Sequence, residues 1–326
     1  MSAAIAAILA VALAVLAALL VPPLLRRRRR RLAFGGTVSE PLRAAIARNV
    51  PVTRSLPREL SRRFEGLVIS FLAEKQFVGC NGLAITDEVR ATIAAQACLL
   101  LLGRRGLYDE LQSILVYPGA FWVEDEVHDD DGLVTHRRRE LSGEAWDSQR
   151  IILSWEDIED TARRPADGYN VVLHEFAHYL DAEGRGLAPL PPAREKSAGG
   201  PVRAIDAWHG DLVAEYDALC AAVDRGERTF LDPYAAEDEV EFFAVASEEF
   251  IECSADLREA HPRLYALLRE FYGIDPAEWS ARAFVPGLPR ASGKADTLAR
   301  GRPGTNAWSA APERIPVKAR EFARRM

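Results

Sequence analysis

The sequence predicts an α+β fold in which a small mixed sheet precedes the helices that carry the chemistry. Strand-like runs at residues 113–117, 121–127 and 150–155 are rich in aromatic and β-branched residues. Two later segments, 171–181 and 239–251, repeat apolar residues at the three-to-four spacing typical of helices. A mixed sheet followed by such helices is an α+β arrangement.

The N-terminus predicts a membrane anchor. Residues 3–25 carry no charge and are rich in Ala, Leu, Val and Ile. As a helix they would extend about 34 Å, enough to cross a hydrocarbon core of roughly 30 Å. The arginine run, residues 26–31, follows directly, which is the reverse of the charge order in a signal peptide. The positive-inside rule then places the arginines in the cytoplasm. A cleaved or reversibly bound targeting segment is the alternative.

Composition divides the rest of the chain in two. Residues 32–284 predict one acidic globular unit, long enough to bury a core without disulfides. An acidic body argues against nucleic-acid binding, which requires a basic stripe. Residues 285–326 are rich in Pro, Gly, Ser, Ala and Arg and predict a basic, disordered tail. The four cysteines are far apart, which fits reduced thiols in the cytoplasm.

Three shorter signals precede the helices that carry the chemistry. Residues 83–102 predict a helix that Thr86 caps and Gly103 stops. Residues 129–132 predict a charged turn among the strands. Residues 143–146 are a candidate substrate-contact region, although an ordinary hairpin turn explains them equally well.

The sequence HExxH at residues 174–178 indicates a metal site. Residues four apart lie on one face of a helix, so His174 and His178 can direct two imidazoles at one ion. Glu175 projects about 100° round the helix, where it could hold a metal-bound water. Asn170 is a suitable N-cap. The alternative is an amphipathic helix that contains the pattern by chance.

A catalytic zinc site needs a third protein ligand and an open fourth position. The helix at 239–251 offers Glu241 and Glu248, which are seven residues apart and share one side. Spacing alone does not separate them; we take Glu241 as the ligand and Glu248 as a supporting or structural carboxylate. Asp181 follows His178 by three residues and is expected to orient an imidazole N–H or to lie at the helix end, rather than to bind metal.

These residues resemble a known family. The HExxH segment with Leu180 and Asp181, followed by residues 232–234 and 241–245, is similar to the Mlc titration factor A peptidases. The resemblance covers roughly residues 50–280. The tyrosine, the seven-residue step and the Glu-Phe-Phe-Ala sequence are also similar to the catalytic domain of anthrax lethal factor, a gluzincin-type metalloprotease. The resemblance implies the zincin-like version of the α+β fold.

The resemblance also implies roles for individual residues. His174, His178 and Glu241 would bind one Zn²⁺, and Glu175 would be the general base. Tyr234 would donate a hydrogen bond to the developing oxyanion. The sequence Asp-Pro-Tyr at 232–234 is equally typical of a turn with an aromatic residue that plugs the start of a helix.

The expected function is a zinc metallopeptidase anchored in the bacterial inner membrane by a single pass, with its catalytic domain in the cytoplasm. Its partners would be a peptide or protein substrate and the membrane, and the resemblance suggests aminopeptidase activity. The family's link to a transcriptional repressor cannot be transferred, because the anchor and tail depart from the family's soluble pattern. The alternative is a non-catalytic zincin-scaffold protein that sequesters such a regulatory partner. Charged flanks of the motif argue against an intramembrane protease.

Overall fold

The computed structural model describes most of the chain between residues 36 and 280. The described ranges are 36–119, 121–128, 134–141, 143–147, 149–183 and 205–280, with scattered residues between 11 and 33. Most of the predicted anchor at 1–31 and all of the predicted tail at 285–326 lie outside these ranges. Within the described part, no helix has both the length and the apolarity needed to cross a membrane.

The principal sheet is small and mostly parallel. Its four strands lie in the order β1-β2-β6-β5, with β1, β2 and β6 parallel and β5 antiparallel to β6. The strands are β1 (Gln76–Gly79), β2 (Ser113–Tyr117), β5 (Gly143–Asp147) and β6 (Arg150–Ser154). The predicted strands at 113–117 and 150–155 are confirmed, the second ending one residue early because Ser154 caps the next helix. Residues 143–146 form an edge strand.

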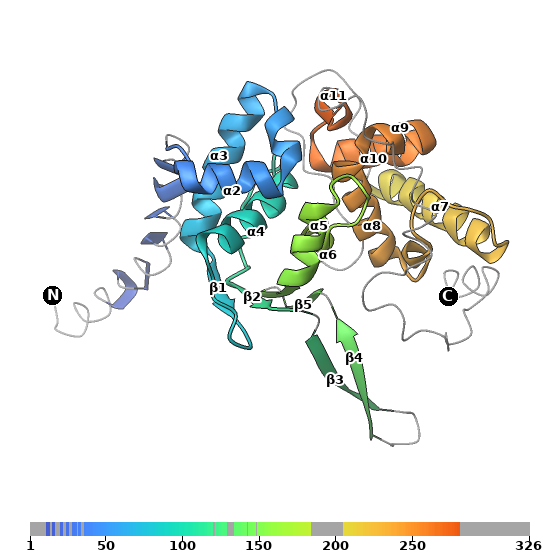
Figure 1. Ribbon diagram of the computed structural model, residues 1–326, viewed down its shortest axis with the longest axis horizontal. Coiled ribbons are helices and arrows are strands. Elements are labelled where there is room, and N and C mark those ends of the chain that lie inside the picture. The colour runs from blue at the N-terminus through green and yellow to red at the C-terminus, as the bar shows by residue number, and fades with distance from the viewer. Residues whose placement is uncertain are drawn as a thin grey trace.

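A separate antiparallel pair consists of β3 (Phe121–His128) and β4 (Val134–Leu141). Figure 1 shows this two-stranded ribbon extending away from the helices. The predicted strand at 121–127 is therefore confirmed. The charged turn predicted at 129–132 lies outside the described residues.

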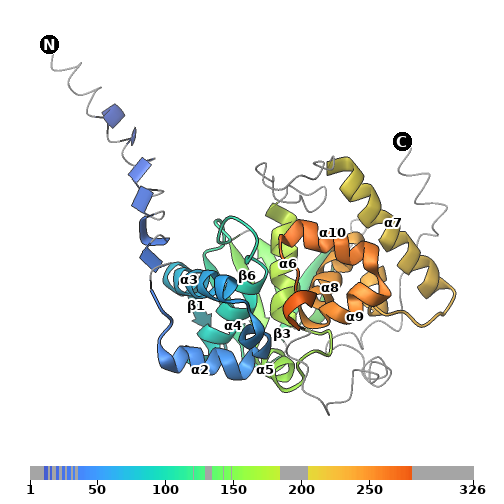
Figure 2. The ribbon, with the colours of Figure 1, turned by 90° about the horizontal axis from the view of Figure 1, so that it is seen from above.

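Helices make up the rest of the described fold. Figures 1 and 2 show α2, α3 and α4 on one side and the later helices α7 to α10 on the other, with α6 between them. The helices are α2 (Glu40–Asn49), α3 (Arg58–Glu74), α4 (Asp87–Leu99), α5 (Trp155–Arg163), α6 (Val171–Glu183), α7 (Ile205–Asp224), α8 (Glu239–Glu252), α9 (Ser254–Ala260), α10 (Pro262–Tyr272) and α11 (Ala277–Ser280), with the short 3₁₀ helices η1 (Pro51–Ser55) and η2 (Pro233–Ala236).

Helix α4 begins at the predicted cap but ends before the predicted stop. The hydroxyl of Thr86 accepts a hydrogen bond from the Val89 amide at 3.3 Å, so the predicted N-cap is confirmed. The helix ends at Leu99, short of Gly103. A Cβ on Gly103 would lie 2.3 Å from the Tyr272 carbonyl oxygen, so this glycine lets the end of α10 pack directly against the backbone after α4.

Helices α6 and α8 pack together at the centre of the core. The three-to-four spacing of apolar residues predicted a helix here but not its full burial, and every residue from Phe242 to Ile251 is buried. Helices α6, α7, α9 and α10 and η2 all contact α8, which explains why it has no solvent face over this stretch. Side chains on α6 and α8 are therefore held by the buried core.

Candidate metal centre

Three side chains converge where α6 passes the first turn of α8. His174 and His178 come from α6 and Glu241 from α8, and one potential ligand atom of each lies within 4.8 Å of the others. The Nε2 atoms of the two histidines are 3.0 Å apart. Glu241 Oε2 lies 3.1 Å from His174 Nε2, and its Oε1 lies 3.5 Å from His178 Nε2. This metal cluster joins two segments that are more than sixty residues apart in the chain.

The start of α6 is fixed by Asn170. Its side-chain oxygen accepts a hydrogen bond from the Leu173 amide at 3.0 Å, which confirms the predicted N-cap. The backbone carbonyl of Asn170 accepts the amide of His174 at 2.9 Å. His174 therefore lies in the first turn of the helix, and the cap helps to fix the position of its backbone.

Glu248 takes a different position from Glu241, although spacing could not separate them. Its side chain is completely buried, and its Oε1 lies 2.8 Å from His174 Nδ1. Its Oε2 accepts the Asn170 backbone amide at 2.6 Å. One carboxylate therefore contacts both the imidazole of His174 and the residue that caps the helix.

The hydrogen bonds around His174 indicate that the metal cluster suits a cation. An ionised Glu248 only accepts, so the Nδ1 of His174 carries the proton, and in the neutral ring the Nε2 presents a lone pair. That lone pair faces Glu241 Oε2, a buried atom with no hydrogen-bond partner among the described residues. Lone pairs that face one another across about 3 Å require a positive charge between them. The donor set of two imidazoles and one carboxylate therefore fits a divalent metal ion.

The electrostatics of Glu241 agree with a cationic environment. Burial of its carboxylate opposes ionisation. The two imidazoles beside the carboxylate outweigh that effect and hold the pKa of Glu241 well below its usual range. The carboxylate is therefore ionised at neutral pH, which is the form that binds a metal.

The loop before α6 is fastened to α8 by residues that the sequence did not single out for this role. Asn170 donates from its side chain to Glu252 at 2.9 Å, and the Ala166 amide donates to the same carboxylate at 3.2 Å. Gly168 has a φ of +83°, and a Cβ there would lie 2.4 Å from Glu249 Oε1. The only sequence signal was a glycine two residues before the helix cap. It does not reveal a close contact with another helix unless the contacting residue is known.

We expect Gly168→Ala to destabilise the protein by about 1–3 kcal/mol, because the methyl group adds a clash to the strain of a positive φ. Urea unfolding followed by circular dichroism measures the change. Gly226→Ala is the matched control, since Gly226 has a φ of +67° with open space around its Cβ position. Equal losses in the two variants would show that the approach of Glu249 contributes nothing.

The two residues with predicted catalytic roles, Glu175 and Tyr234, come from different elements. Glu175 is buried on α6, between the two histidines in sequence. Tyr234 lies in η2, with its ring centroid 6.3 Å from that of His174. The Tyr234 amide donates to the Asp232 side chain at 2.8 Å, so the turn that the sequence also predicted is present. The structure thus brings Tyr234 to the region of the two histidines, while Glu175 is placed there by its position next to His174 in the chain.

Asp181 lies near the end of α6, which was one of its two expected placements, and no hydrogen bond to an imidazole is found for it among the described residues. The buried Nδ1 of His178 has no hydrogen-bond partner in the described part of the chain. Burial raises the pKa of Asp181, and the charges of His178 and His209 partly offset that rise. His209, on α7, is close enough for its charge to affect Asp181.

Comparisons with known proteins agree with the metal cluster. The model of the glucose-regulated metallopeptidase M90 family matches residues 24–273. Mlc titration factor A of Pectobacterium atrosepticum is 35% identical over 233 residues, which cover 71% of this chain and 85% of that protein. The Klebsiella pneumoniae protein of the same name is 36% identical over 250 residues, covering 74% and 89%. A Synechocystis protein described only as uncharacterized is 35% identical over 235 residues, covering 72% and 83%. This chain belongs to the M90 family of metallopeptidases.

Proposed function

We propose that this chain is a zinc-dependent metallopeptidase of the gluzincin type, which hydrolyses peptide bonds by the attack of water. The convergence of His174, His178 and Glu241 carries the proposal, because it assembles a catalytic type of zinc donor set around one point. The buried Glu175 beside the cluster supports it, since a site that only bound metal would not need a further carboxylate there.

Each residue of the site would then have a separate role in peptide hydrolysis. A bound zinc ion would supply a Lewis acid that lowers the pKa of water to about 7 and polarises a peptide carbonyl. Glu175 takes the proton as water attacks and returns it to the leaving amine. Tyr234 donates its phenolic proton in a hydrogen bond to the oxygen that becomes negative. Glu248 holds the ring of His174 in place through Nδ1.

The sheet offers a route for an extended substrate. Strand β5 pairs with β6 on one side, and no other described strand pairs with its second side. Helix α6 contacts β5, so a peptide added along this edge would run close to the helix that bears the histidines. A peptide or protein substrate fits this arrangement, and the choice between aminopeptidase and endopeptidase activity rests on experiment.

We further propose that the chain is anchored in the bacterial inner membrane by residues 3–25, with its metal cluster in the cytoplasm. The uncharged stretch and the arginine run after it are the support for this orientation.

A second candidate function is the binding of a regulatory protein. Relatives carry the name Mlc titration factor A, and a titrating protein must bind its target. In this alternative the zincin scaffold sequesters a transcriptional repressor without cleaving it. The presence of Glu175 together with the complete donor set favours the enzyme.

The deciding experiment incubates the zinc-loaded full chain with a peptide library and identifies the products by mass spectrometry. Cleavage that a chelator abolishes and added zinc restores is expected. Release of single N-terminal residues would indicate an aminopeptidase, and internal cuts would indicate an endopeptidase. A fully zinc-loaded chain that cleaves no peptide would overturn the proposed reaction and favour the binding protein.

We expect Glu248→Gln to weaken zinc binding by about 10–100-fold, because the amide is a poorer acceptor for the His174 ring proton. Zinc affinity is measured by competition with a chromophoric chelator. Glu259→Gln, at an exposed position on α9, is the control and should bind zinc as the parent does. Parent-like affinity in Glu248→Gln would show that the contact with His174 does not support metal binding.

A further inference from the structure

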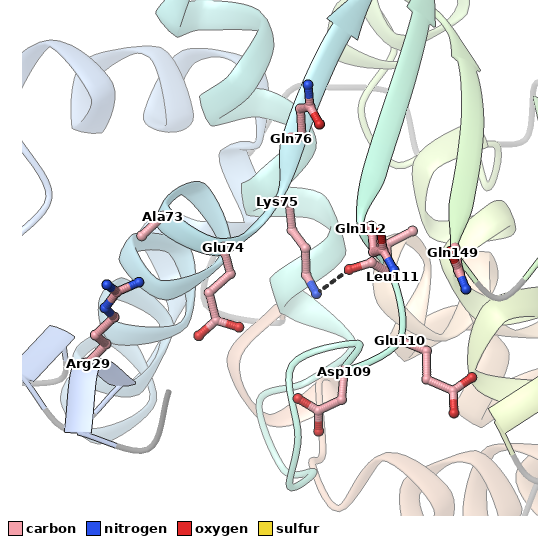
Figure 3. Close-up of a pocket in the computed structure, with 10 residues that line it drawn as sticks. All are labelled: Arg29, Ala73, Glu74, Lys75, Gln76, Asp109, Glu110, Leu111, Gln112 and Gln149. Carbon is pink, nitrogen blue, oxygen red and sulfur yellow. Dashed lines mark hydrogen bonds between the residues drawn. The ribbon is translucent and has the colours of Figure 1, made fainter. Parts of the chain in front are cut away.

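A polar pocket of about 880 Å³ lies at the start of the parallel strands. Its wall includes the end of α3, the loop before β2 and the residues that begin β1 and precede β6. We call it the acidic pocket, because the side chains of Glu74, Asp109 and Glu110 line it. Figure 3 shows these carboxylates around Lys75, which reaches from the end of α3 toward the loop.

Lys75 connects the end of α3 to the loop before β2. Its ammonium group donates to the backbone carbonyls of Tyr108 and Leu111, the second at 2.8 Å. The side chain is buried, and these bonds hold the loop before β2 against α3. The carboxylates of Glu74 and Asp109 bind a cation from another segment of the chain.

The cation that binds these carboxylates is the guanidinium group of Arg30. Arg30 donates from Nε and Nη2 to the two oxygens of Glu74, at 2.9 and 2.7 Å. The same Nη2 lies 2.6 Å from Asp109 Oδ1. Two parallel bonds to one carboxylate are the geometry in which arginine binds most specifically. Arg29 lines the pocket, and the next residue, Arg30, binds two of the carboxylates in its wall.

We propose that the acidic pocket is a docking site for a guanidinium-rich segment, and that its occupant is the chain's own arginine run, held through Arg30. The pairing joins the segment after the predicted anchor to both α3 and the loop before β2. At least one arginine of the run therefore binds protein rather than solvent or lipid.

The pocket loop also contacts α6. The Glu110 amide donates to the Tyr179 hydroxyl at 3.2 Å, and Tyr179 follows His178 directly in the chain. The ring of Tyr108 packs against Phe176 and Tyr179, with centroids 4.7 and 5.3 Å away. Docking of Arg30 against Asp109 should therefore restrain the neighbouring Glu110 amide, which provides a readout that does not depend on peptide hydrolysis.

Hydrogen exchange of the full chain, resolved to residues 107–112 by mass spectrometry, tests the proposal. Arg30→Ala should accelerate exchange there by about fivefold, the scale of one partly exposed ion pair. Arg28→Ala is the matched control, because Arg28 is exposed in the same run and should leave exchange unchanged. Equal exchange in the two variants would overturn the proposal.

Two further measurements separate docking from a general loss of order. Glu74→Gln combined with Arg30→Ala should exchange no faster than Arg30→Ala alone, because the two residues act through one contact. A hexa-arginine peptide added to Arg30→Ala should restore slow exchange, and it should fail to do so when Glu74→Gln and Asp109→Asn are also present. Additive effects in the double variant, or no response to the peptide, would contradict a guanidinium site.

Discussion

Glu175→Gln should reduce peptide hydrolysis by about 10²–10⁴-fold, the range that a general base contributes, while zinc stays bound. Glutamine has the shape of glutamate but cannot take a proton from the attacking water. The three residues of the metal cluster are unchanged, so the metal should remain. The measurements are kcat/KM on a peptide substrate and zinc content by elemental analysis.

The surface variant Glu259→Gln controls for the loss of a carboxylate anywhere on the chain. Its rate and zinc content should match those of the parent. If Glu175→Gln hydrolyses peptides as fast as the parent, Glu175 is not the base. If it loses its zinc instead, the glutamate belongs to the metal-binding set.

Glu241→Ala should abolish stable zinc binding. It removes one of three converging ligands, so the affinity should fall by more than the roughly 100-fold that loss of a supporting residue costs. The fold should survive, because the Glu241 side chain lies in the first turn of α8, ahead of the buried stretch from Phe242 to Ile251. Elemental analysis should find about one zinc per chain in the parent and little in the variant, with unchanged circular dichroism.

The same assay compares the two glutamates on α8. Zinc retained by Glu241→Ala would move the third ligand to Glu248 or Asp181. A folded parent without zinc would reject the metal site itself and bring the regulatory-binding function to first place. Peptide hydrolysis need not be detected for either outcome, so the ligand assignment is tested separately from the reaction.

Much of the metal cluster's position follows from local sequence. Four-residue spacing on α6 brings His174 and His178 to one face, and the Asn170 cap is confirmed by its bond to Leu173. The choice between Glu241 and Glu248 could not follow from spacing, because positions seven apart share a side. Only the packing of α6 against α8 places one beside both Nε2 atoms and the other at Nδ1.

The sheet was predicted less completely. Strand β2 has apolar residues that alternate in burial, and its bounds were predicted correctly. Strand β1 has four residues, mostly exposed, and pairs with a strand that begins more than thirty residues later, so no local pattern marks it. The sequence left open whether Asp181 contacts an imidazole or only lies at the helix end, because helical spacing gives a shared face but not the direction of a side chain.

The burial of α8 limits how the site can be controlled. The stretch from Phe242 to Ile251 is buried, so α8 cannot be displaced without exposing the core. The donor geometry at Glu241 should therefore persist until the whole molecule melts. A regulator would instead act at Tyr234, which is partly buried and lies on the short 3₁₀ helix η2. If Tyr234 is the oxyanion donor that we propose, activity would then be switched there while the metal stays in place.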